Sequence, residues 1–104
     1  MKEVTVQELN ALRQNRASHF LLDVREDDEL AIAKIEGATH IPMGDIAAHM
    51  NELPTDEAII VMCRSGARSA QVTARLDHFG LDAANLKGGI LEWARVIDPS
   101  IQTY

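Results

Sequence analysis

Cysteine is nearly absent: Cys63 is the single one among 104 residues. One thiol excludes an internal disulfide and any zinc site built from several cysteines. A lone free thiol suits a reducing compartment better than export, so we expect a cytoplasmic protein. The histidines lack the spacing of metal ligands, and we expect no metal and no cofactor; they are His19, His40, His49 and His78.

Long apolar runs and positive charge are scarce as well. The longest wholly apolar run, 58–63, is far shorter than the roughly 20 residues that cross a bilayer, and residues 1–5 lack the apolar stretch of a signal peptide. Sixteen acidic residues against ten Lys and Arg give a net charge of −6. An acidic chain repels phosphate groups, so we expect no nucleic-acid partner and no membrane partner.

What the chain does have is enough apolar residues for one core. Hydrophobic residues make up 46% of the sequence, too many for intrinsic disorder. The length suits one folding unit, and no repeat or Gly/Ser-rich linker divides it. We therefore expect a single domain over residues 1–104.

Short apolar runs alternate with helical patterns, which is typical of parallel α/β sheets. The five expected strands lie near Val4 and within 20–24, 37–42, 58–62 and 84–86; the first is marginal and the last is weak. The expected helices follow the capping-box pattern of residues 5–8 and cover 26–33, 45–52, 66–80 and 90–97. This order predicts a three-layer α/β sandwich with helices on both faces of the sheet.

The segment most informative about chemistry is CRSGARS, residues 63–69, between the clearest strand and a strong helical pattern. Ligands of open α/β sheets bind there, beside unpaired N–H groups and the positive end of a helix dipole. Arg64 and Arg68 add positive charge, and Gly66 lets successive N–H groups converge on one anion. Such surroundings lower a thiol pKa from about 8.5 to roughly 3.5–7.5. We therefore predict a reactive thiolate at Cys63 rather than an inert core cysteine.

Loop spacing separates two chemistries for this thiolate. Cysteine phosphatases resemble the segment but have Cys-x5-Arg, usually after a histidine. Here the spacing is Cys-x4-Arg, and Met62 precedes the cysteine. The tighter ring suits a thiolate carrying one extra sulfur better than a tetrahedral phosphate. Sulfur transfer is favoured, and a cysteine phosphatase or arsenate reductase is the less favoured alternative.

Four segments resemble the rhodanese-like sulfurtransferases. They are 22–26 (LDVRE), 37–42 (GATHIP), 63–69 and 86–93 (LKGGILEW), in the order found in that family. The resemblance implies a five-stranded parallel sheet between helices. It also implies a thiosulfate sulfurtransferase that works through a Cys63 persulfide, with a small sulfur donor and a thiol or cyanide as acceptor.

The same resemblance implies roles for the whole loop. Cys63 is the catalytic nucleophile, Arg64 meets an anionic donor, and Arg68 closes the loop structurally. The backbone N–H groups hold the persulfide as preorganised dipoles. The expected substrate-binding residues are Arg64, Ser65, Gly66, Ala67, Arg68 and Ser69.

The C-terminal part resembles one branch of that family. Residues 88–95 and 97–100, with Tyr104 at the end, are similar to rhodanese domains fused to adenylyltransferases of molybdopterin and thiamine biosynthesis. This implies two possible partners, a cysteine desulfurase and a ubiquitin-like sulfur-carrier protein. It leaves open a persulfide carrier or docking module with little activity of its own, or a tail that is merely an inherited structural feature.

Other polar and large residues are expected to be structural. Asp23, Arg25 and Glu26 pair their charges and tie a loop to the sheet. The acidic run 26–29 is a solvated helix start, because acidic residues favour a helix N-terminus. We expect packing roles for Trp93, Met43 and Met50.

Overall fold

The computed structural model describes all residues from 1 to 104. Its elements, in chain order, are β1 (Lys2–Val4), α1 (Val6–Gln14), β2 (Phe20–Asp23), α2 (Asp27–Ile32), β3 (Thr39–His40), the 3₁₀ helix η1 (Met43–Glu52), β4 (Ile59–Met62), α3 (Ala67–His78), β5 (Ala83–Leu86) and α4 (Gly89–Val96). The five strands form one sheet in the order β1-β5-β4-β2-β3, and every neighbouring pair is parallel. The predicted five-stranded parallel α/β fold is confirmed.

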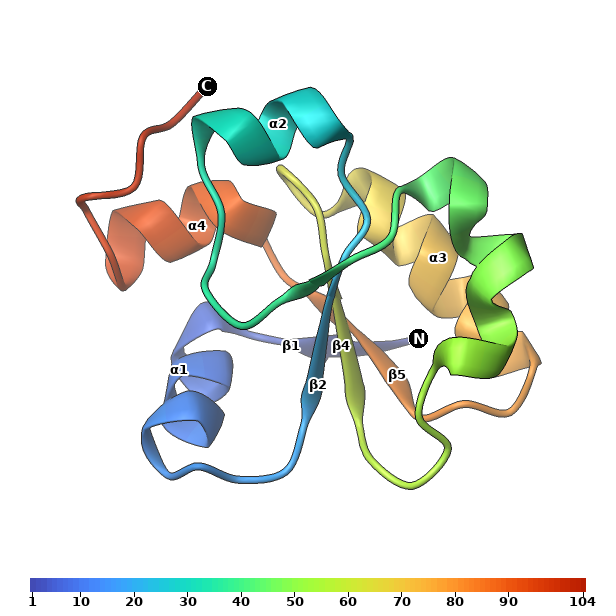
Figure 1. The fold of residues 1–104 in the computed structure, drawn as a ribbon. Coiled ribbons are helices and arrows are strands. Elements are labelled where there is room, and N and C mark those ends of the chain that lie inside the picture. Colours follow the sequence, from blue (N-terminus) through green and yellow to red (C-terminus); the bar gives the residue numbers. More distant parts are fainter.

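Helices cover both faces of the sheet (Figure 1). On one face, α1 and α4 pack against alternate strand residues such as Leu21 and Ile60. On the other face, η1 and α3 pack against the intervening residues, among them Leu22 and Val61. Trp93 is buried in the first of these clusters, as expected. Burial of both strand faces explains why the central strands are apolar at nearly every position.

Local sequence signals place several boundaries. The N–H of Glu8 donates to the Thr5 hydroxyl at 3.1 Å, and the N–H of Thr5 donates to the Glu8 carboxylate at 2.9 Å. This reciprocal capping box starts α1 where the sequence predicts a helix. None of the helices has both the length and the hydropathy needed to cross a lipid bilayer.

Two sequence expectations need correction. The segment expected as a helix over 45–52 is a 3₁₀ helix that already begins at Met43, with the Asp45 N–H bonded to the Pro42 carbonyl at 2.8 Å. The strand expected to be weak, β5, lies between β1 and β4 and is buried at every position. Alanine has low strand propensity, but small side chains fit a strand covered on both faces, so tertiary burial prevails.

The carboxyl ends of β2, β4 and β5 meet at one edge of the sheet, beneath α2 (Figure 1). The chain runs from β4 directly into Cys63, from β2 into Val24 and Arg25, and from β5 into Lys87 and Gly88. This edge therefore holds the cysteine-containing loop that the sequence singled out.

Candidate active site

Cys63 lies at the junction between β4 and the loop that leads into α3. Its side chain is 1% exposed. The sulfur accepts hydrogen bonds from the N–H of Gly66 at 3.1 Å, the N–H of Ser69 at 3.4 Å and the hydroxyl of Ser69 at 3.2 Å. Gly66 has φ +108°, a left-handed conformation that suits glycine and turns its N–H inward. We call these three donors, from Gly66 and Ser69, the cradle.

The cradle changes the acidity of the Cys63 thiol. Burial raises its pKa, but hydrogen bonds from the Ser69 hydroxyl and from the N–H groups of Ser69, Gly66 and Ser65 lower it by more. The net effect is a pKa below the ordinary value, as the sequence predicted. Hydrogen-bond donors in contact with the sulfur stabilise the thiolate, because each of them donates to the charged form.

A buried amide supports the cradle from β5. Asn85 is 4% exposed, its Nδ2 donates to the Gly66 carbonyl at 3.1 Å, and its Oδ1 accepts from the Ser69 hydroxyl at 2.6 Å. The hydroxyl has one proton, so it donates either to Asn85 or to the Cys63 sulfur at a given moment. Sequence reasoning missed this residue, although a polar side chain inside an otherwise apolar strand was the available signal.

The N-terminus of α4 holds the outer side of the loop. The N–H of Ile90 donates to the Cys63 carbonyl at 3.0 Å, and the N–H of Leu91 donates to the Arg64 carbonyl at 3.1 Å. The carbonyls are thereby turned toward the N-terminus of α4, which needs acceptors for its unpaired N–H groups. Gly89 has φ +61°, and a Cβ there would lie 2.4 Å from the Arg64 oxygen. Only glycine permits this approach.

Both arginines of the loop have partners within the chain. Arg68 donates from its two terminal nitrogens to the Glu29 carboxylate at 2.6 and 2.8 Å. Arg64 donates to the backbone oxygen of Tyr104, from Nε at 2.5 Å and also from Nη2. We call this group of Arg64, Arg68, Glu29 and Tyr104 the rim. In the expected island of positive charge, Arg68 is therefore neutralised by Glu29, and Arg64 is hydrogen-bonded to the backbone oxygen of Tyr104.

Glu29 corrects one expectation about the acidic run. The sequence indicated a solvated helix start, yet the Glu29 side chain is only 14% exposed. Hydrogen bonding to Arg68 holds the pKa of Glu29 at about 2, against the opposing effect of burial. The ion pair joins residues 39 positions apart in the sequence, and no local pattern predicts it. Glu26 stays exposed on the surface.

Asp23 and Arg25 form the expected structural pair at the end of β2. Both side chains are buried, and Nη2 of Arg25 lies 2.8 Å from the Asp23 carboxylate. The guanidinium also donates to the Ala33 carbonyl at 2.9 Å and to the Tyr104 hydroxyl at 2.9 Å. A buried charge needs such complete pairing, so this cluster fixes α2 and the rim in place.

Among the remaining predicted loop residues, Ser65 and Ala67 are exposed, and the loop N–H groups rather than their side chains face the sulfur.

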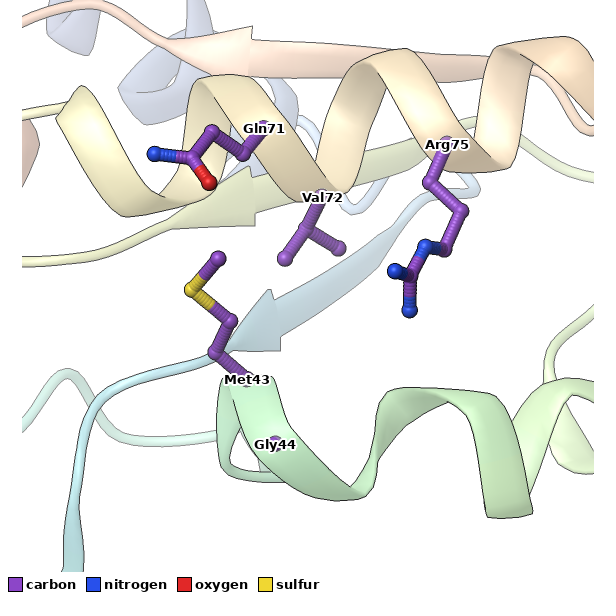
Figure 2. A pocket seen from close by; sticks show the side chains of 5 residues that line it. All are labelled: Met43, Gly44, Gln71, Val72 and Arg75. Carbon is purple, nitrogen blue, oxygen red and sulfur yellow. The ribbon is translucent and has the colours of Figure 1, made fainter.

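A hollow of about 380 Å³ lies between η1 and α3 and does not include Cys63. Met43 and Gly44 line it from η1, and Gln71, Val72 and Arg75 line it from α3 (Figure 2). Met43 and Met50 pack against the core, as expected. No cluster of three His, Cys, Asp or Glu side chains could hold a metal ion.

Comparison with known proteins matches these features to one family. The rhodanese-like domain family matches residues 5–96. A putative sulfurtransferase of Bacillus subtilis, YtwF, is 39% identical over 93 residues, covering 89% of this chain and 90% of its own. A sulfurtransferase of Allochromatium vinosum is 36% identical over 96 residues, covering 91% of this chain and 90% of its own.

Fused and solved relatives extend the match. The probable adenylyltransferase/sulfurtransferase MoeZ of Mycobacterium tuberculosis is 34% identical over 104 residues, covering 97% of this chain but only 26% of its own. The crystal structure of a rhodanese-like domain protein from Staphylococcus aureus superposes with a TM-score of 0.87 at 33% identity, covering 100% of this chain and 99% of the other. The chain belongs to the rhodanese-like domain family.

Proposed function

We propose that this protein is a sulfurtransferase that moves a sulfane sulfur through a persulfide on Cys63. The observation that carries the proposal is the buried Cys63 sulfur held by the N–H groups of Gly66 and Ser69 and the Ser69 hydroxyl. The relatives named as sulfurtransferases support the same reaction class. We treat residues 1–104 as one domain with Cys63 as nucleophile. The substrate-binding residues of the proposal are Arg64, Ser65, Gly66, Ala67, Arg68 and Ser69, of which Ser65 and Ala67 contribute their backbone N–H groups and not their exposed side chains.

The first half-reaction loads the enzyme from thiosulfate. The Cys63 thiolate attacks the outer sulfur, a new S–S bond forms, and the old S–S bond breaks. Its electron pair leaves with sulfite. The N–H groups of the cradle suit the charge on the terminal persulfide sulfur, because preorganised dipoles stabilise an anion without reorganisation.

The second half-reaction removes the sulfur from the Cys63 persulfide. An acceptor thiolate or cyanide attacks the terminal sulfur of the persulfide, and the Cys63 thiolate is the leaving group. With cyanide the product is thiocyanate, and no external oxidant or reductant is needed. A low thiol pKa serves both halves, since the same thiolate is first nucleophile and then leaving group. Ping-pong kinetics are the expected signature.

A persulfide relay is the second candidate. The relatives that include MoeZ and the putative sulfur carrier protein YrkF of Bacillus subtilis suggest a protein donor or acceptor, such as a cysteine desulfurase or a ubiquitin-like sulfur carrier. A single reduced thiol fits such a relay in the cytoplasm. In this case Cys63 accepts sulfur from a protein persulfide, and thiosulfate turnover alone is slow.

Intact-protein mass spectrometry tests both candidates. The reduced chain is incubated with thiosulfate, beside Cys63→Ser and the matched control Ser65→Ala. The expected result is a gain of one sulfur in the wild type and in Ser65→Ala, removed by cyanide and absent from Cys63→Ser. If the chain gains no sulfur from thiosulfate but gains one from a desulfurase with cysteine, the persulfide relay is supported and the thiosulfate sulfurtransferase is contradicted. No gain from either donor would refute both.

A further inference from the structure

The Arg64 side chain, which the sequence assigned to anionic donors, is already occupied. Its Nε and Nη2 both donate to the backbone oxygen of Tyr104, and its guanidinium carbon lies 5.1 Å from the centre of the Tyr104 ring. An oxygen of thiosulfate that used this edge of the guanidinium, Nε with Nη2, would have to displace the Tyr104 oxygen, because a planar guanidinium offers oxyanions paired N–H groups along an edge. Tyr104 and an anionic donor therefore compete for this edge of Arg64.

Tyr104 is held at this position from several sides. Its hydroxyl donates to Glu29 Oε2 at 2.7 Å and accepts from Arg25 Nη1 at 2.9 Å. Ile101 and the Tyr104 ring also pack against the core on the α1/α4 side of the sheet. The C-terminal segment thus reaches the edge of the sheet beside α2 (Figure 1).

The other loop arginine offers no substitute. Arg68 is engaged by both carboxylate oxygens of Glu29, the same residue that accepts from the Tyr104 hydroxyl. Both guanidinium groups beside the cradle are therefore paired within the chain. A dianion approaching Cys63 therefore meets a chain of net charge −6 and two loop guanidinium groups that already hold oxygens of the chain itself.

We infer that Tyr104 is a positioning residue that sets donor selectivity by holding the Arg64 guanidinium. While residues 102–104 stay docked, the site binds small dianionic donors weakly. Undocking frees this edge of Arg64 for them, since the oxygens of the donor then replace the Tyr104 oxygen as acceptors of the same N–H groups. This inference rests on the proposed sulfur transfer and deepens it by naming the donor class that the docked segment disfavours.

The clearest test of this inference measures thiosulfate binding in a variant that cannot form the persulfide. Calorimetric titration with thiosulfate is carried out in the Cys63→Ser background for three chains: full length, shortened after Ile101, and Tyr104→Phe. Ile101 is kept because it packs against the core. We expect the shortened chain to bind thiosulfate at least threefold more tightly, and Tyr104→Phe, which loses only the hydroxyl contacts, to lie between. Thr103→Ala, an exposed change in the same segment, is the matched control and leaves the Kd unchanged.

A double-mutant cycle separates this role from a merely structural one. With Arg64→Ala, shortening the chain should no longer tighten binding. With Cys63 restored, the shortened enzyme should show a lower KM for thiosulfate at similar kcat, and a smaller change for a monoanionic thiosulfonate. Circular dichroism confirms folding, and Tyr104→Phe keeps the test valid if the shortened chain does not fold.

The outcomes distinguish the two hypotheses. An unchanged or weaker Kd in both the shortened chain and Tyr104→Phe, or a gain that persists with Arg64→Ala, overturns the inference even when the wild type forms a persulfide. A gain that depends on Arg64, in a chain that forms no persulfide from any donor, supports the inference and refutes the proposed reaction.

Discussion

The cradle and the two arginines of the rim belong to the same seven-residue loop, yet the cradle and the rim differ in the physical interactions that build them. The cradle consists of neutral donors from Gly66 and Ser69 aimed at one sulfur. The rim consists of two guanidinium groups that pair with oxygens from distant parts of the chain, the Glu29 carboxylate and the backbone oxygen of Tyr104. Neutral dipoles at contact distance act on the sulfur alone, whereas paired charges set what can approach it. The comparison thus separates the acidity of Cys63 from access to it.

The two regions also depend on different parts of the fold. The cradle is fixed by local turns and by two neighbouring elements, Asn85 of β5 and the N-terminus of α4. The rim joins α2, the loop and the C-terminal segment, and the buried Arg25 ties the end of α2 to the C-terminal segment. Changes in backbone geometry should therefore affect the cradle, and changes in side-chain charge should affect the rim.

Gly89→Ala is the strongest way to damage the cradle. The new Cβ would lie 2.4 Å from the Arg64 oxygen and 2.6 Å from the Cys63 oxygen, so the loop must shift. We expect a loss of about 2–3 kcal/mol in the free energy of unfolding. Persulfide formation should fall on the order of a hundredfold, since misplacement by about 1 Å has such effects. Thermal unfolding and mass spectrometry measure the two effects.

Gly80→Ala is the matched control for this change. Its φ is +85°, but nothing lies within 4 Å of a Cβ there. Gly80→Ala therefore has the backbone strain without the clash. We expect it to lower the free energy of unfolding by about 1 kcal/mol and to leave persulfide formation unchanged. Equal activity losses in Gly80→Ala and Gly89→Ala would show that the Gly89 contact does not position the loop.

Ser69→Ala sharpens the comparison by removing one donor of the cradle and no charge. The pKa of the Cys63 thiol should rise, because the Ser69 hydroxyl is the largest of the contributions that lower it. Alkylation by iodoacetamide at neutral pH should slow on the order of tenfold, as expected for losing one hydrogen bond to a charged acceptor. Ser65→Ala, whose exposed side chain makes no contact with the sulfur, is the control. Overlapping pH–rate profiles for Ser69→Ala and wild type would contradict the role of this donor.

The sequence alone was sufficient to predict where the cradle lies, but it was insufficient to predict which residues pair in the rim. The position of Cys63 between a buried strand and a helix, with Gly66 in the turn, follows from local patterns of a few residues. The partners of Arg64 and Arg68 do not, because Tyr104 and Glu29 reach them from positions 40 and 39 residues away. At η1 the apolar spacing predicted a helix but not its 3₁₀ geometry, since both geometries bury the same apolar residues. Long-range side-chain pairing has no periodicity that a single sequence displays.

Glu29→Gln weakens the rim and leaves the cradle in place. The folded-state pKa of Glu29 is about 2, below its ordinary 4.5. Its stabilisation is therefore fully present above pH 4.5 and is lost as the pH falls toward about 2. At pH 6 we expect Glu29→Gln to lower the free energy of unfolding by about 1 kcal/mol or less, because the pair is partly exposed.

Thermal unfolding between pH 6 and 2 follows this effect. The difference in Tm between wild type and Glu29→Gln should shrink across the window from pH 4.5 to about 2. Asp28→Asn, an exposed change in the same helix, should show no such convergence. A constant difference down to pH 2 would mean that the carboxylate charge of Glu29 does not stabilise the rim.

Salt gives the smallest expected effect and the most direct separation of the two regions. At about 1 M NaCl the screening length falls to about 3 Å, which weakens interactions between exposed charges but not hydrogen bonds in contact with a buried sulfur. The pKa of Cys63, followed by thiolate absorbance, should therefore stay nearly constant as salt rises from about 0.05 to 1 M. If Arg64 and Arg68 lowered this pKa through space, as the sequence alone suggested, it would rise with salt. A pKa that rises with salt would mean that the rim stabilises the Cys63 thiolate, whereas a constant pKa means that the cradle stabilises it.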